Sequence, residues 1–440
     1  MSRQVLCVDV GSTFTKAALV DLDGRLLGTA SSPTTLATDV MEGVDACRAD
    51  LAATSDVPAL ACSSAGGGLR LAVVGYEREV TAEAGHRVGL SAGARVSHVA
   101  AGPLAAPGLR DLVDSLPDVV LLVGGTDGGN AEILLHNAAA LAGSHLDVPV
   151  VAAGNVDARD DVVALLRDGA KTVYPTANVL PVIGRLDPGP ARTTIREVFI
   201  RHVIGGKGLS RRADFPSSVR AATPDAVLAG VELLADGAAD VPGAGDVLVV
   251  DVGGATTDVY SVVTPQGEDA VLRRGVVEVM WRARTVEGDL GMRWNAPGVV
   301  EAAADERLLS SGEETTLRPA AERRADDPSY LAATEEEQAV DARLAELAVT
   351  VALRRHGRGG KDLRGVSLVV GSGGVFRHAD TATRARILRP AVRDFGGGWS
   401  VPERARTTVD ASYVLAAAGL LAAEHPRAAA LLLRRCLGTG

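Results

Sequence analysis

One short phrase occurs twice in this chain, 242 residues apart. Residues 5–17 read VLCVDVGSTFTKA, and residues 247–259 read VLVVDVGGATTDV. In both copies an apolar run leads into Asp, Val and Gly, and a short stretch of Gly, Ser and Thr follows. An apolar run that ends in a glycine turn predicts a strand followed by a tight turn. The chain therefore reads as two halves that open in the same way.

Each copy of the phrase begins a set of three expected strands. The first set covers QVLCVDV, KAALVDL and RLLGTAS, with the hairpin pair Asp23–Gly24 before the last strand. The second set covers DVLVVDVGG, TTDVYSVV and AVLRRGVVEV, the last at residues 270–279. Because 440 residues exceed one hydrophobic core, at least two domains are expected. We place the boundary at the Pro/Gly-rich turn 240–246, which gives halves 1–245 and 246–440.

An α/β segment at about 76–190 interrupts the first half. Short apolar runs such as VVLLVGG and VPVVAAGN alternate with expected helices at about 130–143 and 157–169, which is typical of parallel βαβ units. A further helix is expected at about 193–204. In the second half the sequence predicts an amphipathic helix in TEEEQAVDARLAELAVTVALRRHG, a buried strand ending in a glycine turn in GVSLVVGSGGVF, and a small-residue helix over 407–424.

Composition excludes several classes of protein. With 47% hydrophobic and 23% charged residues the chain resembles soluble globular proteins, and no apolar run is long enough to span a membrane. A net charge of −10 disfavours nucleic acid as a partner. The N-terminus leaves no room for a signal peptide, and the four cysteines have no zinc spacing, so a cytoplasmic protein with reduced thiols is expected.

The turns in the doubled phrase have the composition of a phosphate-binding loop. Glycine permits close approach and positive φ, so several backbone N–H groups can converge on one anion. Lys16 adds a positive charge near the terminal phosphates. The expected phosphate ligands are Gly11, Ser12, Thr13, Lys16, Gly253, Gly254, Thr256 and Thr257.

Three carboxylates accompany these turns. Asp9 and Asp251 have the wrong charge for phosphate but suit a hydrated Mg²⁺ that bridges phosphate oxygens. Asp258 is expected to orient water or the metal. One copy alone is better explained as ordinary turn chemistry. Two copies in matching contexts favour a clamp that holds a triphosphate from both sides.

A third motif extends the pattern. The order DVGSTFTK, DVGGATTD, a GxGG turn at Gly371, Gly373 and Gly374, and the helix YVLAAAGLLA resembles the actin/Hsp70/sugar-kinase superfamily of ATPases over nearly the whole chain. This resemblance implies a two-lobed α/β fold of the actin-like (ribonuclease H-like) type. It also implies that the three glycines border the adenosine and that helix 411–424 returns to the interdomain hinge. ATP or ADP with Mg²⁺ would be the ligand, and hydrolysis would be slow.

A closer resemblance lies within that superfamily. The stretches SSAGGGLRLAVVG, LLVGGTDGGN, VVAAGN, DVGGATTDV and VEGDLGMR are similar to the GlmL family, also called MutL, which is unrelated to the mismatch-repair protein of that name. The resemblance implies an accessory protein of an adenosylcobalamin-dependent glutamate (methylaspartate) mutase that reactivates or assembles it. The sequence has no Asp-x-His-x-x-Gly motif, so any cobalamin is expected on the partner's subunits.

Other residues leave alternatives open. Asp127 either orients an attacking water or binds a cation, or it caps the helix that begins near Asn130. Glu287, Asp289 and Arg293 either face the nucleotide or form a local salt-bridged turn. A small-molecule kinase on the same fold, with Asp127 as its base, is the second-ranked function. A nucleotide-gated scaffold without hydrolysis is the third.

Overall fold

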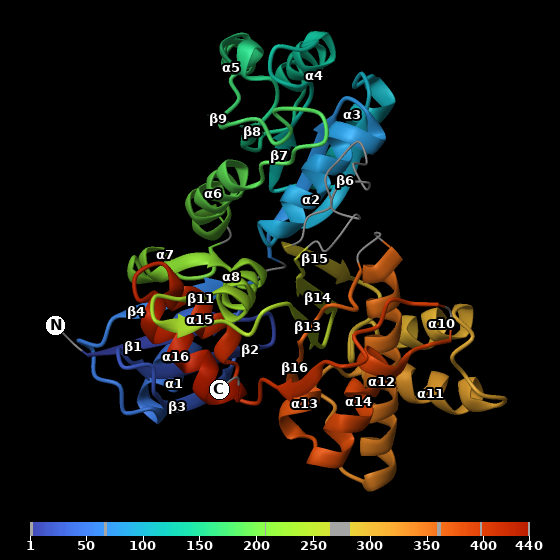
Figure 1. The fold of residues 1–440 in the computed structure, drawn as a ribbon. Coiled ribbons are helices and arrows are strands. Elements are labelled where there is room, and N and C mark those ends of the chain that lie inside the picture. The colour runs from blue at the N-terminus through green and yellow to red at the C-terminus, as the bar shows by residue number, and fades with distance from the viewer. Residues whose placement is uncertain are drawn as a thin grey trace. The chain divides into compact units, whose positions relative to one another are not determined.

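The structure is a computed structural model that describes residues 3–65, 68–206, 208–264, 282–358, 362–396 and 398–438 (Figure 1). These residues form two compact units. The first unit holds the chain up to Gly230 together with Ala416–His425. The second holds Val231–Thr264, the described residues from 282 to Leu415, and the chain from Pro426 onward.

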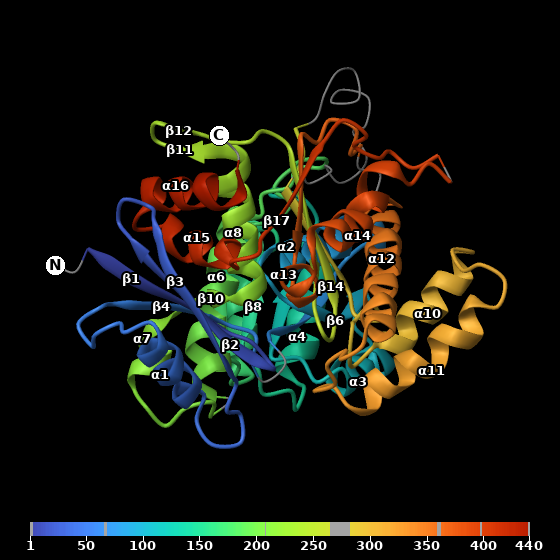
Figure 2. The same cartoon turned by 90° about the horizontal axis from the view of Figure 1, so that it is seen from below.

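The first unit contains a five-stranded sheet in the order β10-β4-β1-β2-β3. Its strands are β1 (Gln4–Val10), β2 (Phe14–Asp21), β3 (Leu26–Pro33), β4 (Ala59–Ser63) and β10 (Val219–Ala222). The first three strands form the predicted antiparallel meander, and β4 and β10 extend it in parallel. Helix α1 (Val40–Asp50) packs against β2 and β3 (Figure 2).

The second unit repeats this strand order as β15-β14-β13-β16-β17. Its strands are β13 (Val247–Val252), β14 (Thr257–Val262), β15 (Arg282–Glu287), β16 (Leu368–Ser372) and β17 (Arg406–Val409). The first three are again an antiparallel meander, and the last two again run parallel to the first. The third strand predicted at 270–279 lies outside the described residues. The doubled phrase therefore marks a doubled sheet.

The inserted segment forms a separate all-parallel sheet in the order β6-β5-β7-β8-β9. Its strands are β5 (Arg70–Gly75), β6 (Arg95–Ala101), β7 (Val119–Leu122), β8 (Val150–Ala152) and β9 (Val173–Pro175). Helices α4 (Glu132–Ala142) and α5 (Arg159–Asp168) confirm the two predicted crossover helices. Helices α2 (Glu83–Ser91) and α3 (Ala106–Asp114) also belong to this segment (Figure 1). One face of this sheet encloses a core of its own with α3, α4 and α5, while the other face belongs to the core of the first sheet.

Two helices lead from the inserted segment back to the first sheet. Helix α6 (Gly189–Val198) continues into a π-helical turn, η4 (Phe199–Ile204), where a single helix at 193–204 was predicted. Helix α7 (Asp214–Ser218) then precedes β10, and helix α8 (Thr223–Asp236) follows it. A short hairpin, β11 (Gly237–Ala238) and β12 (Val241–Pro242), comes after α8.

Long helices supply the core of the second unit. The predicted amphipathic helix is α12 (Glu335–Arg358), whose apolar residues pack beside β13 and β14. Helices α10 (Ala296–Asp305), α11 (Glu313–Asp326), α13 (Gly374–His378) and α14 (Thr381–Arg393) complete this core.

The single helix predicted over 407–424 is wrong at its start. Residues 406–409 form strand β17, because Thr407, Thr408 and Val409 are β-branched and pair beside β16. The buried Asp410 then accepts hydrogen bonds from the backbone N–H groups of Val414 and Leu415 and so begins helix α15 (Val414–Ala422). Helix α16 (Pro426–Leu437) ends the described chain.

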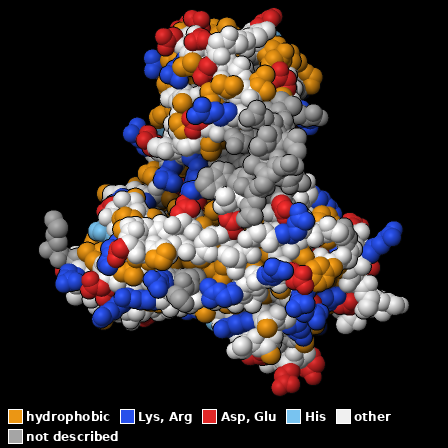
Figure 3. Space-filling view, viewed as in Figure 1, with side chains coloured by type: hydrophobic (Ala, Val, Ile, Leu, Met, Phe, Trp, Pro, Cys, Tyr) orange, Lys and Arg blue, Asp and Glu red, His pale blue; other side chains and the backbone are white. Residues whose placement is uncertain are grey.

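Among the described residues no helix has the length and apolarity needed to cross a bilayer. On the face drawn in Figure 3, Lys and Arg side chains are interspersed with Asp and Glu side chains.

Candidate functional site

The first glycine turn joins β1 to β2. The Gly11 N–H donates to the Phe14 carbonyl at 3.1 Å, and a side chain at Gly11 would place its Cβ 2.7 Å from that oxygen. The turn therefore requires glycine at this position. Ser12 and Thr13 are exposed at its tip. The Ser12 hydroxyl donates to the Ser64 carbonyl at 3.1 Å, which ties the turn to the end of β4.

The second turn, between β13 and β14, closes with the same hydrogen bond. The Gly253 N–H donates to the Thr256 carbonyl at 2.9 Å. Three successive carbonyls of this turn accept hydrogen bonds from the segment 292–295: Gly253 from Met292, Gly254 from Arg293 and Trp294, and Ala255 from Asn295.

This arrangement orients the N–H groups of the second turn. In a planar trans peptide the C=O and the following N–H point in opposite directions. The N–H groups of Gly254, Ala255 and Thr256 therefore point away from the segment 292–295. Within the described part of the chain these three groups have no protein acceptor. Unpaired backbone N–H groups of successive residues in a turn are the kind of donor set that can bind an anion.

Asp9 lies beside the first turn and is held by three neighbours. The Thr223 hydroxyl donates to Asp9 Oδ1 at 2.6 Å, and Cys62 Sγ lies 3.7 Å from the same oxygen. Burial, and then the charge of Asp9, raise the pKa of the Cys62 thiol well above its usual value, so Cys62 is a neutral donor. Asp9 Oδ2 lies 3.9 Å from Lys16 Nζ, since Lys16 is directly opposite Asp9 in the β1–β2 pair.

Asp251 occupies the equivalent position in the second sheet, but its cross-strand partner is Asp258 instead of a lysine. The buried Arg284 of β15 neutralises Asp258 through its NH2 and Nε groups, at 2.6 and 2.9 Å from Oδ1. Burial alone would lower the pKa of Arg284, yet the adjacent carboxylate raises it, so the guanidinium stays charged. Sequence reasoning missed Arg284; the available signal was an unbalanced carboxylate opposite Asp251.

Two residues predicted as direct ligands support the second turn from inside. The Thr257 hydroxyl is buried and donates to the Leu290 carbonyl at 2.5 Å. The Thr256 hydroxyl donates to Asp258 Oδ2 at 3.1 Å, which connects the turn to the Asp258–Arg284 ion pair. Asp258 is therefore engaged with Arg284 and Thr256.

The third glycine turn follows β16, which pairs with β13 so that Ser372 lies beside Asp251. Gly373 has φ +109°, and a Cβ there would lie 2.2 Å from the Val252 carbonyl oxygen. A Cβ on Gly371 would meet the Phe376 ring at 2.9 Å, whereas Gly374 has only Tyr413 Oη near it, at 3.9 Å. The third turn thus lies at the same edge of this sheet as the second.

The donor set of these turns fits a hydrated Mg²⁺. Asp9 and Asp251, each two residues before a turn glycine, would offer the carboxylate oxygens that this ion prefers. Among the residues that the structure describes, no three His, Cys, Asp or Glu side chains group together as a metal cage. Mg²⁺ in nucleotide sites characteristically uses one or two carboxylates, waters and substrate phosphates, so these residues match its chemistry.

Asp127 belongs to the inserted sheet and not to either doubled sheet. Its Oδ1 accepts hydrogen bonds from the Val156 N–H at 3.0 Å and from Asn178 Nδ2 at 2.8 Å. It therefore joins the loops that follow β7, β8 and β9. The N–H of Glu132, the first residue of α4, donates to Asn130 Oδ1 at 2.7 Å, not to Asp127.

Glu287, Asp289 and Arg293 form ion pairs, but their partners lie on the distant helix α12, so the local salt-bridged turn that was one of the two alternatives is not what the structure shows. Glu287 and Asp289 bind Arg355 of α12 at 2.9 and 2.7 Å. Burial raises the pKa of Glu287 despite that arginine. Arg293 binds Asp341 of the same helix at 3.1 Å. These pairs anchor the segment that holds the carbonyls of the second turn.

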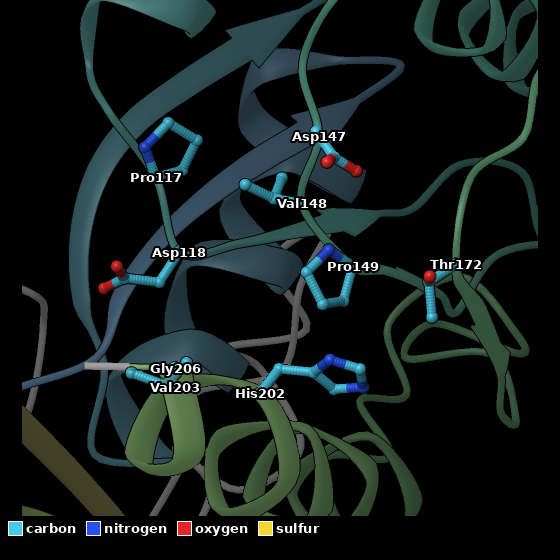
Figure 4. Close-up of a pocket in the computed structure, with 9 residues that line it drawn as sticks. All are labelled: Pro117, Asp118, Asp147, Val148, Pro149, Thr172, His202, Val203 and Gly206. Atoms are coloured by element: carbon cyan, nitrogen blue, oxygen red, sulfur yellow. The ribbon is translucent and has the colours of Figure 1, made fainter. Parts of the chain in front are cut away.

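A separate cavity of about 420 Å³ lies in the first unit (Figure 4). It is lined by residues that precede β7, β8 and β9, among them Asp118, Asp147 and Thr172, and by His202 of η4. Ligands of parallel sheets bind beyond the carboxyl ends of the strands, whereas this cavity lies at their amino ends. The glycine turns of the doubled sheets follow the carboxyl ends of their strands instead, where the sequence predicted the site.

The doubled sheet, with a glycine turn and a carboxylate at the same place in each copy, defines the actin-like class of ATPase folds and confirms the fold class predicted above. A family model described as "MutL protein" matches residues 5–437. Protein MutL of Clostridium tetanomorphum is 35% identical over 458 residues, covering 98% of each chain. The chain therefore belongs to the MutL (GlmL) family.

Solved structures show weaker likenesses. The nucleotide-free structure of acetone carboxylase is 14% identical with a TM-score of 0.39, covering 95% of this chain and 70% of that one. The activator of the 2-hydroxyisocaproyl-CoA dehydratase from Clostridium difficile, with bound ADPNP, is 10% identical with a TM-score of 0.34, covering 97% of this chain and 95% of that one.

Proposed function

We propose that this chain is an ATP-binding accessory protein that reactivates or assembles an adenosylcobalamin-dependent mutase of the glutamate type. Membership of the MutL family supports the accessory role. The observation that carries nucleotide binding is the pair of equivalent turns, each closed by the same N–H to C=O bond and each following a carboxylate by two residues.

In this proposal the backbone N–H groups of both turns, that of Thr256 among them, bind phosphate oxygens together with the side chains of Ser12, Thr13 and Lys16. Asp9 and Asp251 hold the hydrated Mg²⁺, which when bound neutralises charge on the phosphates. Gly371, Gly373 and Gly374 border the adenosine, while Thr257 and Asp258 keep the second turn in shape. Cobalamin stays on the mutase subunits. Hydrolysis is slow, because the nucleotide serves to bias conformation more than to drive turnover.

The metal part of the proposal predicts the behaviour of Asp251→Asn. The amide keeps the shape but loses the charge, so the gain in ADP affinity that Mg²⁺ confers should fall at least about tenfold, or about 1.4 kcal/mol. Calorimetry with Mg²⁺ and with EDTA measures this gain. Asp246→Asn is the matched control, because Asp246 precedes the same strand at its other end and binds Thr264. An unchanged gain in Asp251→Asn would contradict the assignment.

The function itself is tested by mixing. A B12-dependent mutase inactivated during turnover should recover when this protein, ATP and fresh adenosylcobalamin are added together. Omitting ATP, or using Asp9→Ala, should abolish recovery. The nucleotide can affect the mutase only if the mutase binds the nucleotide-bound and nucleotide-free states of this protein with different affinities. If the mutase recovers without nucleotide, the ATP-dependent role is contradicted and only a role as a scaffold remains. A phosphorylated product, found when sugars and small acids are screened in parallel, would favour the kinase.

A further inference from the structure

Thr223 stands next to Asp9 although 214 residues separate them in the chain. It follows β10 directly, and β10 pairs in parallel with β4, which pairs in parallel with β1. The carboxyl ends of all three strands therefore lie along one edge of the first sheet. This topology brings the Thr223 hydroxyl within 2.6 Å of Asp9 Oδ1.

The two oxygens of Asp9 have different surroundings. Oδ1 accepts from Thr223, with the neutral Cys62 thiol 3.7 Å away. Oδ2 faces Lys16 Nζ at 3.9 Å on the side of the β1–β2 turn. A carboxylate can only accept, so the Thr223 hydroxyl is the donor. A charge-assisted hydrogen bond of this length fixes the orientation of the carboxylate.

Thr223 is itself anchored by the start of helix α8. Asp225, in the first turn of that helix, has a side chain only 1% exposed. Its carboxylate binds two arginines of helix α6, Arg192 at 3.2 Å and Arg196 at 2.5 Å. Pro224, between the two residues, has the fixed φ that suits a helix start. Thr223 therefore lies between strand β10, which is paired with β4, and Asp225, which is held by two arginines.

We infer that Thr223 is a positioning residue for the metal-carrying carboxylate of the first turn. Its hydroxyl holds Asp9 Oδ1, so that Oδ2 is directed toward the hydrated cation and the phosphates. This inference rests on the proposed function, because it takes Asp9 to hold Mg²⁺. Residues that orient a ligating carboxylate typically contribute a tenfold or greater factor to metal affinity.

The test compares variants by their metal-dependent gain, the ratio of ADP affinities measured by calorimetry with Mg²⁺ and with EDTA. Thr223→Val has nearly the same shape but no hydroxyl, and its gain should fall about tenfold while the metal-free affinity is unchanged. Thr223→Ser restores the hydroxyl and should restore the gain. Thr81→Val is the control, because Thr81 is a buried threonine of the same unit whose hydroxyl accepts from Tyr76 and Glu77. It should lower stability and keep the gain.

The outcomes separate this inference from the proposed function. A normal gain in the wild type that persists in Thr223→Val overturns the positioning role and leaves nucleotide binding intact. A wild type without any gain overturns both. Circular dichroism checks folding; if Thr223→Val is unfolded, Thr223→Ala replaces it and is compared with Thr223→Ser in the same way. A loss in Thr223→Ser equal to that in the hydroxyl-free variant would also contradict the role.

Discussion

Replacing Arg284 by Met should destabilise the second unit by about 3–5 kcal/mol. The substitution leaves the Asp258 carboxylate nearly buried, with no cation, and directly across the strand pair from Asp251. Breaking one side of a buried ion pair is costly because the remaining charge has lost both water and its partner. Urea denaturation followed by circular dichroism measures the loss.

A double variant separates charge from packing in this prediction. Asp258→Asn combined with Arg284→Met removes both charges and should recover most of the stability lost by Arg284→Met alone, since no isolated buried charge remains. If the single and double variants are equally destabilised, the loss comes from packing and the electrostatic argument fails.

Gly373→Ala should cost about 3 kcal/mol or more. The backbone at this position has φ +109°, which a residue with a Cβ adopts only under strain, and the new methyl group would lie 2.2 Å from the Val252 carbonyl oxygen. The Val252 carbonyl cannot move away from the new methyl group, because strand β13 is paired on both sides as the central strand of its sheet. The midpoint of urea unfolding reports the effect.

The adjacent glycine provides the control for that substitution. Gly374 begins helix α13, and the nearest atom to a Cβ there is Tyr413 Oη at 3.9 Å. Gly374→Ala should therefore change stability by less than about 1 kcal/mol. Equal losses from the two alanine variants would show that neither the positive φ nor the close approach at Gly373 is limiting.

The sequence predicted the parts of the fold in which a strong local pattern coincides with the final structure. The first meander and the first two strands of the second have apolar strands and glycine turns, and helix α12 has a long amphipathic pattern, so these were recognised, whereas β15 was not predicted at its place. Strands β4 and β10, with the sequences ALACS and VRAA, have few residues of high β propensity and are ordered mainly by their neighbours in the sheet. They were not predicted for that reason.

The candidate site likewise contains residues that the sequence predicted and residues that it did not. The glycines and carboxylates of the two turns were predicted because each turn is a local phrase. Arg284 and Thr223 were missed, since their roles depend on strand register and on parallel pairing between distant segments. Lys16 lies across from Asp9, and Asp258 occupies the equivalent place across from Asp251. Only the strand register shows that Asp258, unlike Lys16, needs a buried arginine to balance its charge.

The insertion between β4 and β10 has a consequence for how the chain acquires its structure during synthesis. Ala61 and Val219 are partners in the first sheet, but they are 158 positions apart in the chain (219 minus 61). All strands of the inserted parallel sheet, one face of which has its own core, precede β10 in the chain and leave the ribosome before it. Until then one edge of β4 presents unpaired backbone groups to other nascent chains. Slow, late closure of this sheet is therefore the step at which we expect aggregation to compete with folding.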